Sequence, residues 1–548
     1  MTDSPSSFDG NDAPAQRPQA LEDLLDLDAK LLSMVARRSR IIQRAAKGRQ
    51  VLHRDLEKQL WTGFEQAARQ QKLDPRFARQ LFPLLNGFGL EVQEDRRSAD
   101  KPFALVPRSE PADIDIKGPR SLSRTRMLAV LAAATGAPMR LSGVVLNDPL
   151  IELVKALNQA GAHLAWALDE LTSSAATGKA DEFPLRFEDV LVFAGEEPFT
   201  LYVLLALALR EAGRSKFAGG PGLKFLDLRS LDALLLPLGA RLAAMNPRSH
   251  GLPARLESGG RMASRLELSP AAPPQFAQAL ALAAWSYPEG LRLVLSAEPA
   301  AAAAQALALD EVLDALNQCQ VAASRQGNEY VIPPGRPKIP AAPALPLDPA
   351  LAAYLLALPS LAGGVARLRG EAVLPEPVRT DFAALGISIS QSAGAAQASR
   401  GTLPAGQTLG MGRLPEYLPL ALALVIKAGG GRVLLPLDAA ARTHAADLLE
   451  RLGVGFATED EALVLHPGEL KPWEGVWTSP DPYTTLALAL LSFLRPGIAI
   501  DNPASLAFIW PRFWAVYNAL PVVREQSPAP PKESEKHDPK PRKQRVRV

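Results

Sequence analysis

A short phrase recurs along this chain at nearly even spacing, and in each copy an apolar helical stretch runs into a turn and then into strand-like residues. The copies are about 65 to 80 residues apart, which is too long for a solenoid repeat and too regular for chance. Each interval also contains a second apolar helix. The pattern predicts six α/β units and an internally symmetric body. The phrases are ALNQAGAHLAW (156–166), ALLLPLGARLAA (233–244), ALNQCQVAA (315–323), ALGISIS (384–390), LERLGVGFA (449–457) and VYNALPVV (516–523).

The chain around these units divides by composition. Residues 1–19 and 524–548 are rich in proline, serine and charge, which predicts disordered tails. The second tail is basic, and we interpret it as a solvated tail rather than a contact for nucleic acid or membrane. Residues 20–95 have leucines at helical spacing and predict an all-helical module.

Composition narrows the class of protein. The chain has 548 residues, 47% of them apolar, and a formal net charge of +2, which predicts a soluble protein with more than one packed domain. The N-terminus lacks the basic and apolar regions of a secretory signal. The chain has a single cysteine, Cys319, which excludes a disulfide within one chain. The few histidines are scattered. We therefore expect a cytoplasmic protein with no metal and no cofactor.

The most specific motif is Gly-Pro-Arg-Ser-Leu-Ser-Arg-Thr-Arg at 118–126, which leads into the apolar stretch MLAVLAAAT. A turn with basic and hydroxyl side chains at a helix start is a plausible anion cradle. The motif resembles the opening signature of the 5-enolpyruvylshikimate-3-phosphate (EPSP) synthase family, Gly-Ser-Lys-Ser-x-Ser-x-Arg. Arg120, Ser121 and Ser123 fall on the Lys and the two Ser positions, and Thr125 falls on the final Arg.

The resemblance covers about residues 113–523 and implies a fold. It implies two domains of three units each, 113–346 and 347–523, with the chain crossing between them near Gly118 and near Leu347 and with the substrates in the cleft. The helical module 20–95 precedes them.

The resemblance also implies substrate-binding residues in the first domain. The family's glycine-rich phosphoenolpyruvate loop becomes GEEPFTLY at 195–202, where Glu196 and Glu197 would repel a phosphate and Tyr202 falls on an Arg position. The next motif becomes GGPGLKFLD at 219–227 and keeps Lys224 as its cation. The Ser-Ser-Gln-Phe turn becomes Pro-Pro-Gln-Phe, which keeps Gln275.

In the second domain the family's catalytic Asp position carries Glu416, a workable carboxylate. Arg442 and Arg413 are nearby cations, whereas Tyr483 and Phe508 fall on cationic positions. Among the roughly seven cationic positions that the family's motifs imply for holding phosphate and carboxylate groups, only Arg120 matches in place. The resemblance therefore implies enolpyruvyl transfer from phosphoenolpyruvate to shikimate 3-phosphate if the protein is active. The alternative is a catalytically degenerate scaffold, or a metabolite-binding or regulatory protein, that takes a shikimate 3-phosphate-like molecule.

The helical module resembles the all-helical chorismate mutase family, through LDAKLLSMVARRSRIIQRAAKGR at 27–49. The resemblance implies a chorismate-binding dimer, although Leu21 replaces an expected Arg. A third hypothesis is therefore a chorismate mutase fused to the EPSP synthase-like scaffold, and its alternative is the basic face of an ordinary helical dimerisation hairpin. The implied site residues are Arg38, Arg49, Asp55, Lys58 and Gln93.

Overall fold

The computed structural model divides into two compact units, residues 1–103 and 104–548. The residues that the structure describes are 27–28, 30–31, 33–38, 41, 54–71, 82, 102–106, 111–167, 169–175, 183–188, 190–220, 223, 226, 228–245, 251–260, 262–392, 394–436, 438–459, 461–520 and 522–524. The expected tail 1–19 lies outside them, and so does the expected tail 524–548 except for Arg524, which the structure places at the end of a strand.

The described part of the first unit is helical, as predicted. The helix α2 (Arg54–Gln70) is amphipathic, and the described residues between 27 and 41 are helical too. The buried Phe82 packs edge-on against Trp61, with 5.2 Å between ring centroids, and lies 5.4 Å from Phe64. The Arg38 guanidinium lies 5.9 Å from the Phe82 ring centroid. An aromatic cluster therefore holds the described parts of this unit together.

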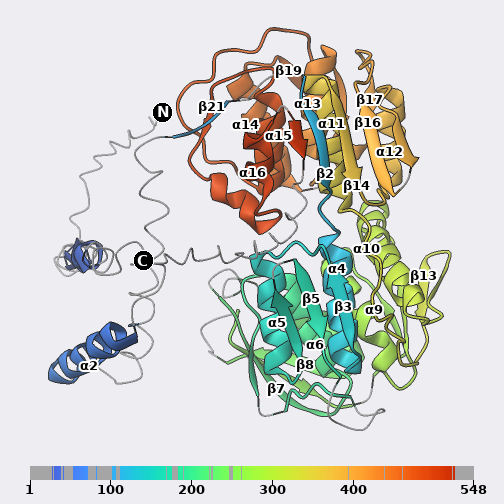
Figure 1. Cartoon of the computed structure of the whole chain (residues 1–548). Helices are drawn as coiled ribbons and strands as arrows, with labels where there is room; N and C mark the ends of the chain where they lie inside the picture. The colour runs from blue at the N-terminus through green and yellow to red at the C-terminus, as the bar shows by residue number, and fades with distance from the viewer. Residues whose placement is uncertain are drawn as a thin grey trace, which may run out of the picture. The chain divides into compact units, whose positions relative to one another are not determined.

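The second unit is a mixed α/β body whose described strands form small sheets in two halves (Figure 1). Its first half contains three sheets. Their strand orders are β3 (Met139–Ser142), β5 (Glu170–Ser173), β4 (Leu164–Ala167); then β6 (Leu191–Phe193), β7 (Gly213–Ala218), β9 (Ala254–Ser258), β8 (Ala240–Ala244); and β10 (Arg265–Glu267), β11 (Leu291–Val294), β13 (Glu329–Ile332), β12 (Ser324–Gln326).

The second half repeats the arrangement. Its larger sheets follow the orders β15 (Ile389–Ser392), β16 (Ala395–Ser399), β14 (Val365–Arg369), β2 (Asp113–Lys117), β22 (Val522–Arg524) and β17 (Thr408–Leu409), β18 (Gly431–Leu434), β20 (Ala462–Leu465), β19 (Phe456–Glu459). A two-stranded sheet pairs β1 (Phe103–Leu105) with β21 (Ile498–Ile500).

The recurring phrases mark equivalent places in these sheets. In the sheets that begin with β6, β10 and β17, a parallel pair is followed by an antiparallel hairpin, and β2, β14, β16 and β15 repeat that pattern. Each phrase begins in the last turns of a helix and leads through a turn to the next strand, which is β4, β8, β12, β15, β19 or β22. Those helices are α5 (Asp148–Gln159), α8 (Arg229–Leu235) with a short 3-10 turn, α10 (Pro299–Gln318), α12 (Glu376–Ala384), α14 (Ala439–Leu452) and α16 (Phe513–Asn518). The six-unit α/β prediction is confirmed.

The turn that follows each of the first five of these helices contains a left-handed residue. Gly239, Gly386 and Gly453 have φ near +70° there, and Gly161 has φ +110°. In the third of the six repeat units this place is taken by Gln320, with φ +61°. The third unit therefore carries backbone strain that the others avoid.

The last of the six repeat units departs from the pattern. Its closing strand β22 does not return to β21 but pairs in parallel with β2, with Asp113 opposite Val522. Figure 1 shows β2, which comes before the first half in the chain, beside β14 in the second half.

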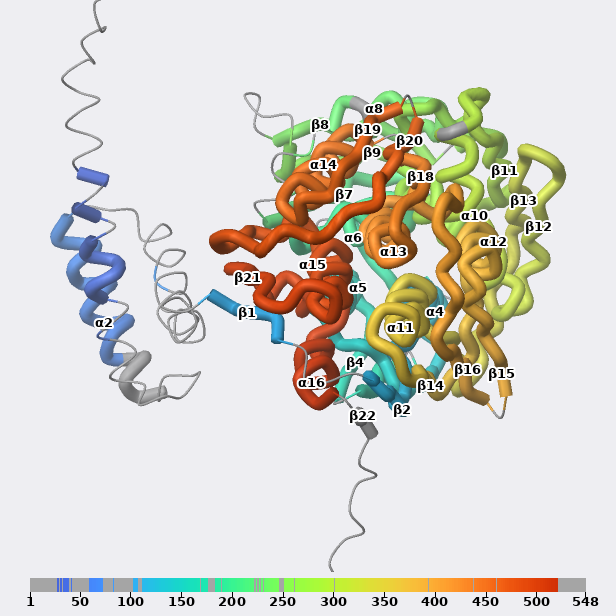
Figure 2. The backbone as a smooth tube through the Cα atoms, turned by 90° about the horizontal axis from the view of Figure 1, so that it is seen from above, coloured from blue at the N-terminus to red at the C-terminus, as the bar shows by residue number. Residues whose placement is uncertain are grey.

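The described part of the body has six inner helices, whose central residues are buried on every side. In the second half α11, α13 and α15 pack against one another (Figure 2). Helices that are apolar all round belong in a core, so these helices form the centres of the two halves. They are α4 (Leu122–Thr135), α6 (Pro198–Ala208), α9 (Pro274–Ala283), α11 (Pro349–Ala362), α13 (Leu418–Ala428) and α15 (Pro482–Leu491). Among the described residues, every helix is too short or too polar to span a lipid bilayer.

The chain crosses between the halves twice, and the two crossings pair with each other. Arg120 and Leu347 form an antiparallel bridge. Asp348 N–H donates to the Pro119 carbonyl at 2.8 Å, and Ser121 N–H donates to the Pro346 carbonyl at 2.9 Å. A Cβ on Gly118 would lie 2.5 Å from Leu347 Cδ2, so a larger residue there would displace the Leu347 side chain at the paired crossings.

Candidate functional site

The N-terminal ends of several inner helices meet where the two halves face each other. Asp348, which caps α11 by accepting from Leu351 N–H at 3.1 Å, also accepts from Leu122 N–H at the start of α4 at 3.3 Å. Ser121 caps α4 by accepting from Arg124 N–H at 3.1 Å. Helix N-termini carry partial positive charge, so this meeting point favours anionic groups.

A carboxylate from a third helix belongs to the same place. Glu311 Oε2 of α10 accepts from Ser123 Oγ at 2.7 Å and from Gln278 Nε2 at 3.3 Å. Burial raises the pKa of Glu311, and the nearby charge of Asp348 raises it further, although the Ser123 hydrogen bond opposes this. Three helices of the first half therefore contribute to one polar cluster.

Glu416, the predicted catalytic residue, precedes α13 in the second half. Its backbone carbonyl accepts from the Tyr354 hydroxyl at 3.1 Å. Burial raises the pKa of the Glu416 carboxyl, and the charges of Glu311 and Asp348 add to the rise. A carboxyl whose pKa is raised toward neutral pH is suited to exchange a proton with a substrate.

An ion pair covers the start of α6. Arg126 Nη1 donates to Glu197 Oε1 at 2.8 Å, and the two side chains are 15% and 17% exposed. The Arg126 guanidinium also lies 5.9 Å from the Phe199 ring centroid and interacts electrostatically with Asp348 and Tyr483. Glu197, which the sequence suggested would repel a phosphate, is thus neutralised by a cation of the protein itself.

The predicted binding residues of the first domain lie in different settings. Arg120 lies at the paired crossings, where Nη1 donates to the Leu345 carbonyl at 3.4 Å and a side chain at Gly370 would collide with its guanidinium. Ser121 is buried as the α4 cap. Gln275 is exposed at the start of α9, whereas Gln278, one turn later, is buried in the polar cluster. Lys224 lies outside the described residues.

In the second domain the candidate cations are held by the protein. Arg442 on α14 donates from Nε to the Pro436 carbonyl at 2.6 Å. Arg413 pairs with Glu461 at 2.9 Å, and both side chains are exposed. The roles of these residues, and those of Arg120, Ser121, Gln275 and Lys224, remain predictions.

Uncharged groups occupy positions where the resemblance implies cations. Tyr202 is buried and meets Phe276 edge-on, with 5.6 Å between ring centroids. Tyr483 stacks on Tyr354 at 6.3 Å. The Phe508 carbonyl accepts from Asn147 Nδ2 of the other half at 2.6 Å. Of these three residues, Tyr483 interacts electrostatically with Asp348 and Glu416, so an uncharged aromatic side chain belongs to the meeting point.

Sequence reasoning missed Glu311, Asp348 and Gln278 as members of this site. Asp348 had a local signal, because an Asp before a Pro that opens an apolar stretch is typical of a helix cap. Glu311 had none, since its partners Ser123 and Gln278 are far away along the chain.

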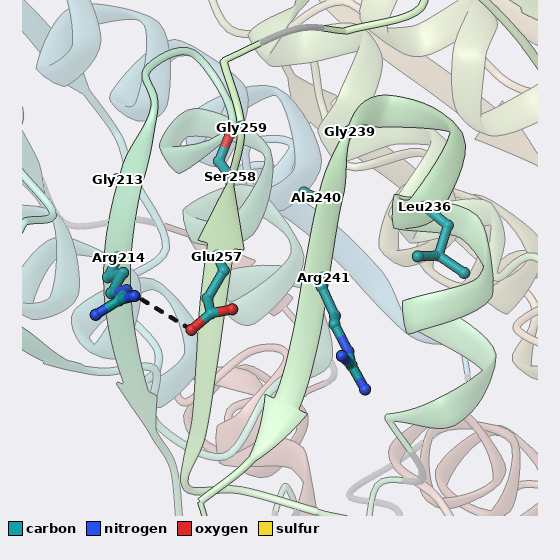
Figure 3. Close-up of a pocket in the computed structure, with 9 residues that line it drawn as sticks. All are labelled: Gly213, Arg214, Leu236, Gly239, Ala240, Arg241, Glu257, Ser258 and Gly259. Carbon is teal, nitrogen blue, oxygen red and sulfur yellow. Dashed lines mark ion pairs between the residues drawn. The ribbon is translucent and has the colours of Figure 1, made fainter.

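A hollow of about 510 Å³ lies elsewhere, on the outer face of the sheet that contains β7, β9 and β8 (Figure 3). Arg214 and Glu257 pair across it at 3.7 Å, and Arg241 lies on the adjacent strand. Its lining comes from one unit and includes no inner helix end, so it is separate from the candidate site. Within the described ranges no cluster of three His, Cys, Asp or Glu residues could hold a metal ion.

The architecture is a two-domain α/β fold that this chain shares with solved EPSP synthase structures. An EPSP synthase from Acinetobacter baumannii matches with a TM-score of 0.62 and 17% identity, covering 76% of this chain and 98% of that one. The enolpyruvyl transferase NikO from Streptomyces tendae matches with a TM-score of 0.57 and 16% identity, covering 74% of this chain and 94% of that one.

Curated relatives point to one family within this class. The 3-phosphoshikimate 1-carboxyvinyltransferase of Methanoculleus marisnigri is 25% identical over 424 residues, which are 75% of this chain and 97% of that protein. The enzyme of the same name from Bordetella petrii is 24% identical over 446 residues, which are 77% of this chain and 97% of that protein. No protein-family model matches the chain. The sequence and structure comparisons together support the similarity of this chain to the EPSP synthase family.

Proposed function

We propose that this chain is an EPSP synthase-family protein of the shikimate pathway, whose reaction is enolpyruvyl transfer from phosphoenolpyruvate to shikimate 3-phosphate. The observation that carries the proposal is Glu416, a half-buried carboxyl with a raised pKa at the start of an inner helix. In this role Glu416 takes the proton of the attacking hydroxyl. Arg120, Ser121, Gln275, Lys224 and Arg442 are the proposed substrate-binding residues. The proposed domains are 113–346 and 347–523.

The test is to incubate the purified protein with both substrates and to measure released phosphate and the enolpyruvyl product. We expect Glu416→Gln to lower turnover by about 100- to 10,000-fold, as the loss of a proton-transfer group does. Glu459→Gln, an exposed glutamate on β19, is the matched control and should leave turnover unchanged. If the wild-type protein releases no phosphate and forms no product, this function is wrong.

A second candidate is a catalytically degenerate protein that binds a shikimate-pathway metabolite. The Arg126–Glu197 pair favours it, because the protein supplies both charges where a phosphate would need free cations. This candidate predicts that shikimate 3-phosphate binds and raises the melting temperature, with no turnover when phosphoenolpyruvate is added. Product formation by the wild-type chain would exclude it.

For residues 20–95 we propose a chorismate mutase-like module that forms a homodimer, in a cytoplasmic protein. Arg38 supports this, because it is half-buried and burial lowers its pKa. Asp55 and Lys58 lie on α2, whereas Arg49 and Gln93 lie outside the described residues.

The dimer is tested by sedimentation of the full chain, and the activity by conversion of chorismate. Because Leu21 replaces one expected Arg, we expect turnover well below the ordinary range of about 1 to 1,000 per second. A strict monomer would contradict the dimer, and ordinary turnover would contradict the weak activity.

A further inference from the structure

The outer face of the sheet that contains β7, β9 and β8 carries an excess of positive charge. Side chains alternate between the two faces of a strand, and on these strands the inner ones are buried while the outer ones are exposed or half-buried. Glu257 is the single acidic residue of the three strands. The exposed cations are Arg214 and Lys216 on β7, Arg255 on β9 and Arg241 on β8.

The strand register places these side chains in two rows across the sheet. In the first row Glu257 lies opposite Arg214 on one side and opposite Arg241 on the other, as Figure 3 shows. In the second row Lys216 lies directly opposite Arg255. Like charges directly opposite each other on antiparallel strands destabilise a sheet. An anion beside this second row would remove the repulsion.

Glu257 does not balance the charge of these rows. Its Oε1 lies 3.0 Å from Arg255 Nε and 3.7 Å from Arg214 Nε, so one carboxylate is shared by two arginines. Neither Lys216 nor Arg241 has an ion-pair partner among the described residues. On the other sheets of the second unit, strand arginines pair with carboxylates of their own, as in Arg140–Glu170, Arg265–Glu267, Arg369–Asp115 and Arg432–Glu459.

A hollow gives this positive charge the shape of a ligand site. It has a volume of about 510 Å³, and Arg214, Arg241, Glu257 and Leu236 are among the residues that line it. This volume falls within the range of small-molecule sites, about 300–1,000 Å³. Leu236 is 58% exposed and offers an apolar contact. A ligand can therefore place a ring against Leu236 and its charged groups on the arginines.

The charge of the two rows selects the charged group of the ligand. Guanidinium groups bind phosphate oxygens through strong, charge-assisted hydrogen bonds. One phosphate group carries about two negative charges at neutral pH, which is less than the surplus of four cations over one carboxylate. Two linked phosphate groups match this surplus better. The small hollow and the net charge of +2 favour a small molecule over a nucleic acid, whose binding domains are strongly basic.

We propose that the hollow beside β7, β9 and β8 is a binding site for a small organic diphosphate, such as a nucleoside diphosphate. Its phosphate groups contact Arg214 and Arg241, and its ring contacts Leu236. The site is separate from the candidate site described above. The proposal therefore goes beyond enolpyruvyl transfer and does not depend on it.

The experiment is titration calorimetry of the full-length chain in magnesium-free buffer with ADP, AMP and adenosine. These probes share one organic part and differ in their number of phosphate groups. We expect ADP to bind most tightly, AMP more weakly, and adenosine at least tenfold more weakly than ADP. Raising the salt concentration should weaken ADP binding, because salt screens exposed charges.

Substitutions locate the binding. Arg241→Gln should weaken ADP binding about three- to tenfold, as the loss of one hydrogen-bonded partner does. Glu257→Gln should strengthen ADP binding about threefold, because it removes a negative charge from the site. Arg367→Gln is the matched control, since Arg367 is an exposed arginine on β14 in another sheet, and it should leave ADP affinity unchanged. All three side chains are at least partly exposed, and melting temperatures close to that of the wild type would show that the variants fold.

Three results would overturn the proposal. The first is no ADP binding, or equal binding of ADP and adenosine. The second is ADP binding that Arg241→Gln leaves unchanged, which would place the ligand elsewhere on the protein. The third is oligothymidylate binding that is tighter than ADP binding and is weakened by Arg241→Gln, which would assign this surface to a nucleic acid.

Discussion

Asn147 connects the two halves of the body and also caps a helix, and these two roles can be separated by mutation. Its Oδ1 accepts from Leu150 N–H at 3.1 Å, which caps α5, while its Nδ2 donates to the Phe508 carbonyl of the other half at 2.6 Å. The residue is 2% exposed. Water cannot easily replace either bond.

Asn147→Asp keeps the capping oxygen but places a second oxygen against the Phe508 carbonyl. We expect it to weaken the contact between the halves by about 1–3 kcal/mol, the cost of leaving a buried polar group unpaired. At 1.4 kcal/mol per factor of ten, this shifts the equilibrium toward separated halves by about 5- to 150-fold. Asn147→Ala also removes the cap and should lower the free energy of unfolding by about another 0.5–2 kcal/mol.

The assay combines small-angle X-ray scattering with urea unfolding. Asn147→Asp should increase the radius of gyration, and Asn147→Ala should increase it and lower the unfolding midpoint further. Asn158→Asp is the matched control, because Asn158 bonds both backbone groups of Leu164 within the first half, at 2.8 and 2.9 Å. It should lower stability without expanding the protein. Identical scattering and stability of Asn147→Asp and the wild type would refute the reasoning.

Two further substitutions test the strain and the buried charge. Gln320→Gly should raise the free energy of unfolding by about 1 kcal/mol, because glycine adopts φ +61° without steric cost. Gln318→Gly, inside the helix, should instead lower the free energy of unfolding by about 0.5 kcal/mol. Equal effects of the two substitutions in urea unfolding would contradict the backbone strain at Gln320. Burial raises the pKa of Glu311 above the unfolded value of about 4.3, so its contribution to stability is full below that pH and is lost as pH rises through the raised pKa. Glu311→Gln should therefore gain stability relative to the wild type as pH increases from 5 to 8, and a constant difference across that range would contradict this.

The local features of this fold could be predicted from sequence, because a helix end and its turn depend on neighbouring residues. The phrase at 449–457 indicates α14, the left-handed Gly453 and β19 in order, and the structure has them. The phrase at 315–323 has no glycine, so Gln320 could be recognised only by its place in the repeat.

Long-range features could not be predicted in this way. Nothing near Val522 indicates that β22 joins the sheet of β2, since the two strands are separated by most of the body. The polar cluster of Glu311 has the same character, because motif comparison follows a register along the chain and Glu311 lies in no motif. The family resemblance led to Glu416 but not to the carboxylate that shares its surroundings.

The position of β2 has a consequence for synthesis on the ribosome. Residues 119–346 of the first half are contiguous, so their sheets can form as soon as the chain emerges. β2 precedes them, but its partners β14 and β22 are made roughly 250 and 400 residues later, at about 5–20 residues per second. Both edges of this strand therefore stay unpaired for about 10 to 50 seconds, until β14 is made, and one edge waits longer for β22. Its charged residues Asp113, Asp115 and Lys117 alternate with buried Ile114 and Ile116, and such charges on an unpaired edge oppose aggregation during the wait.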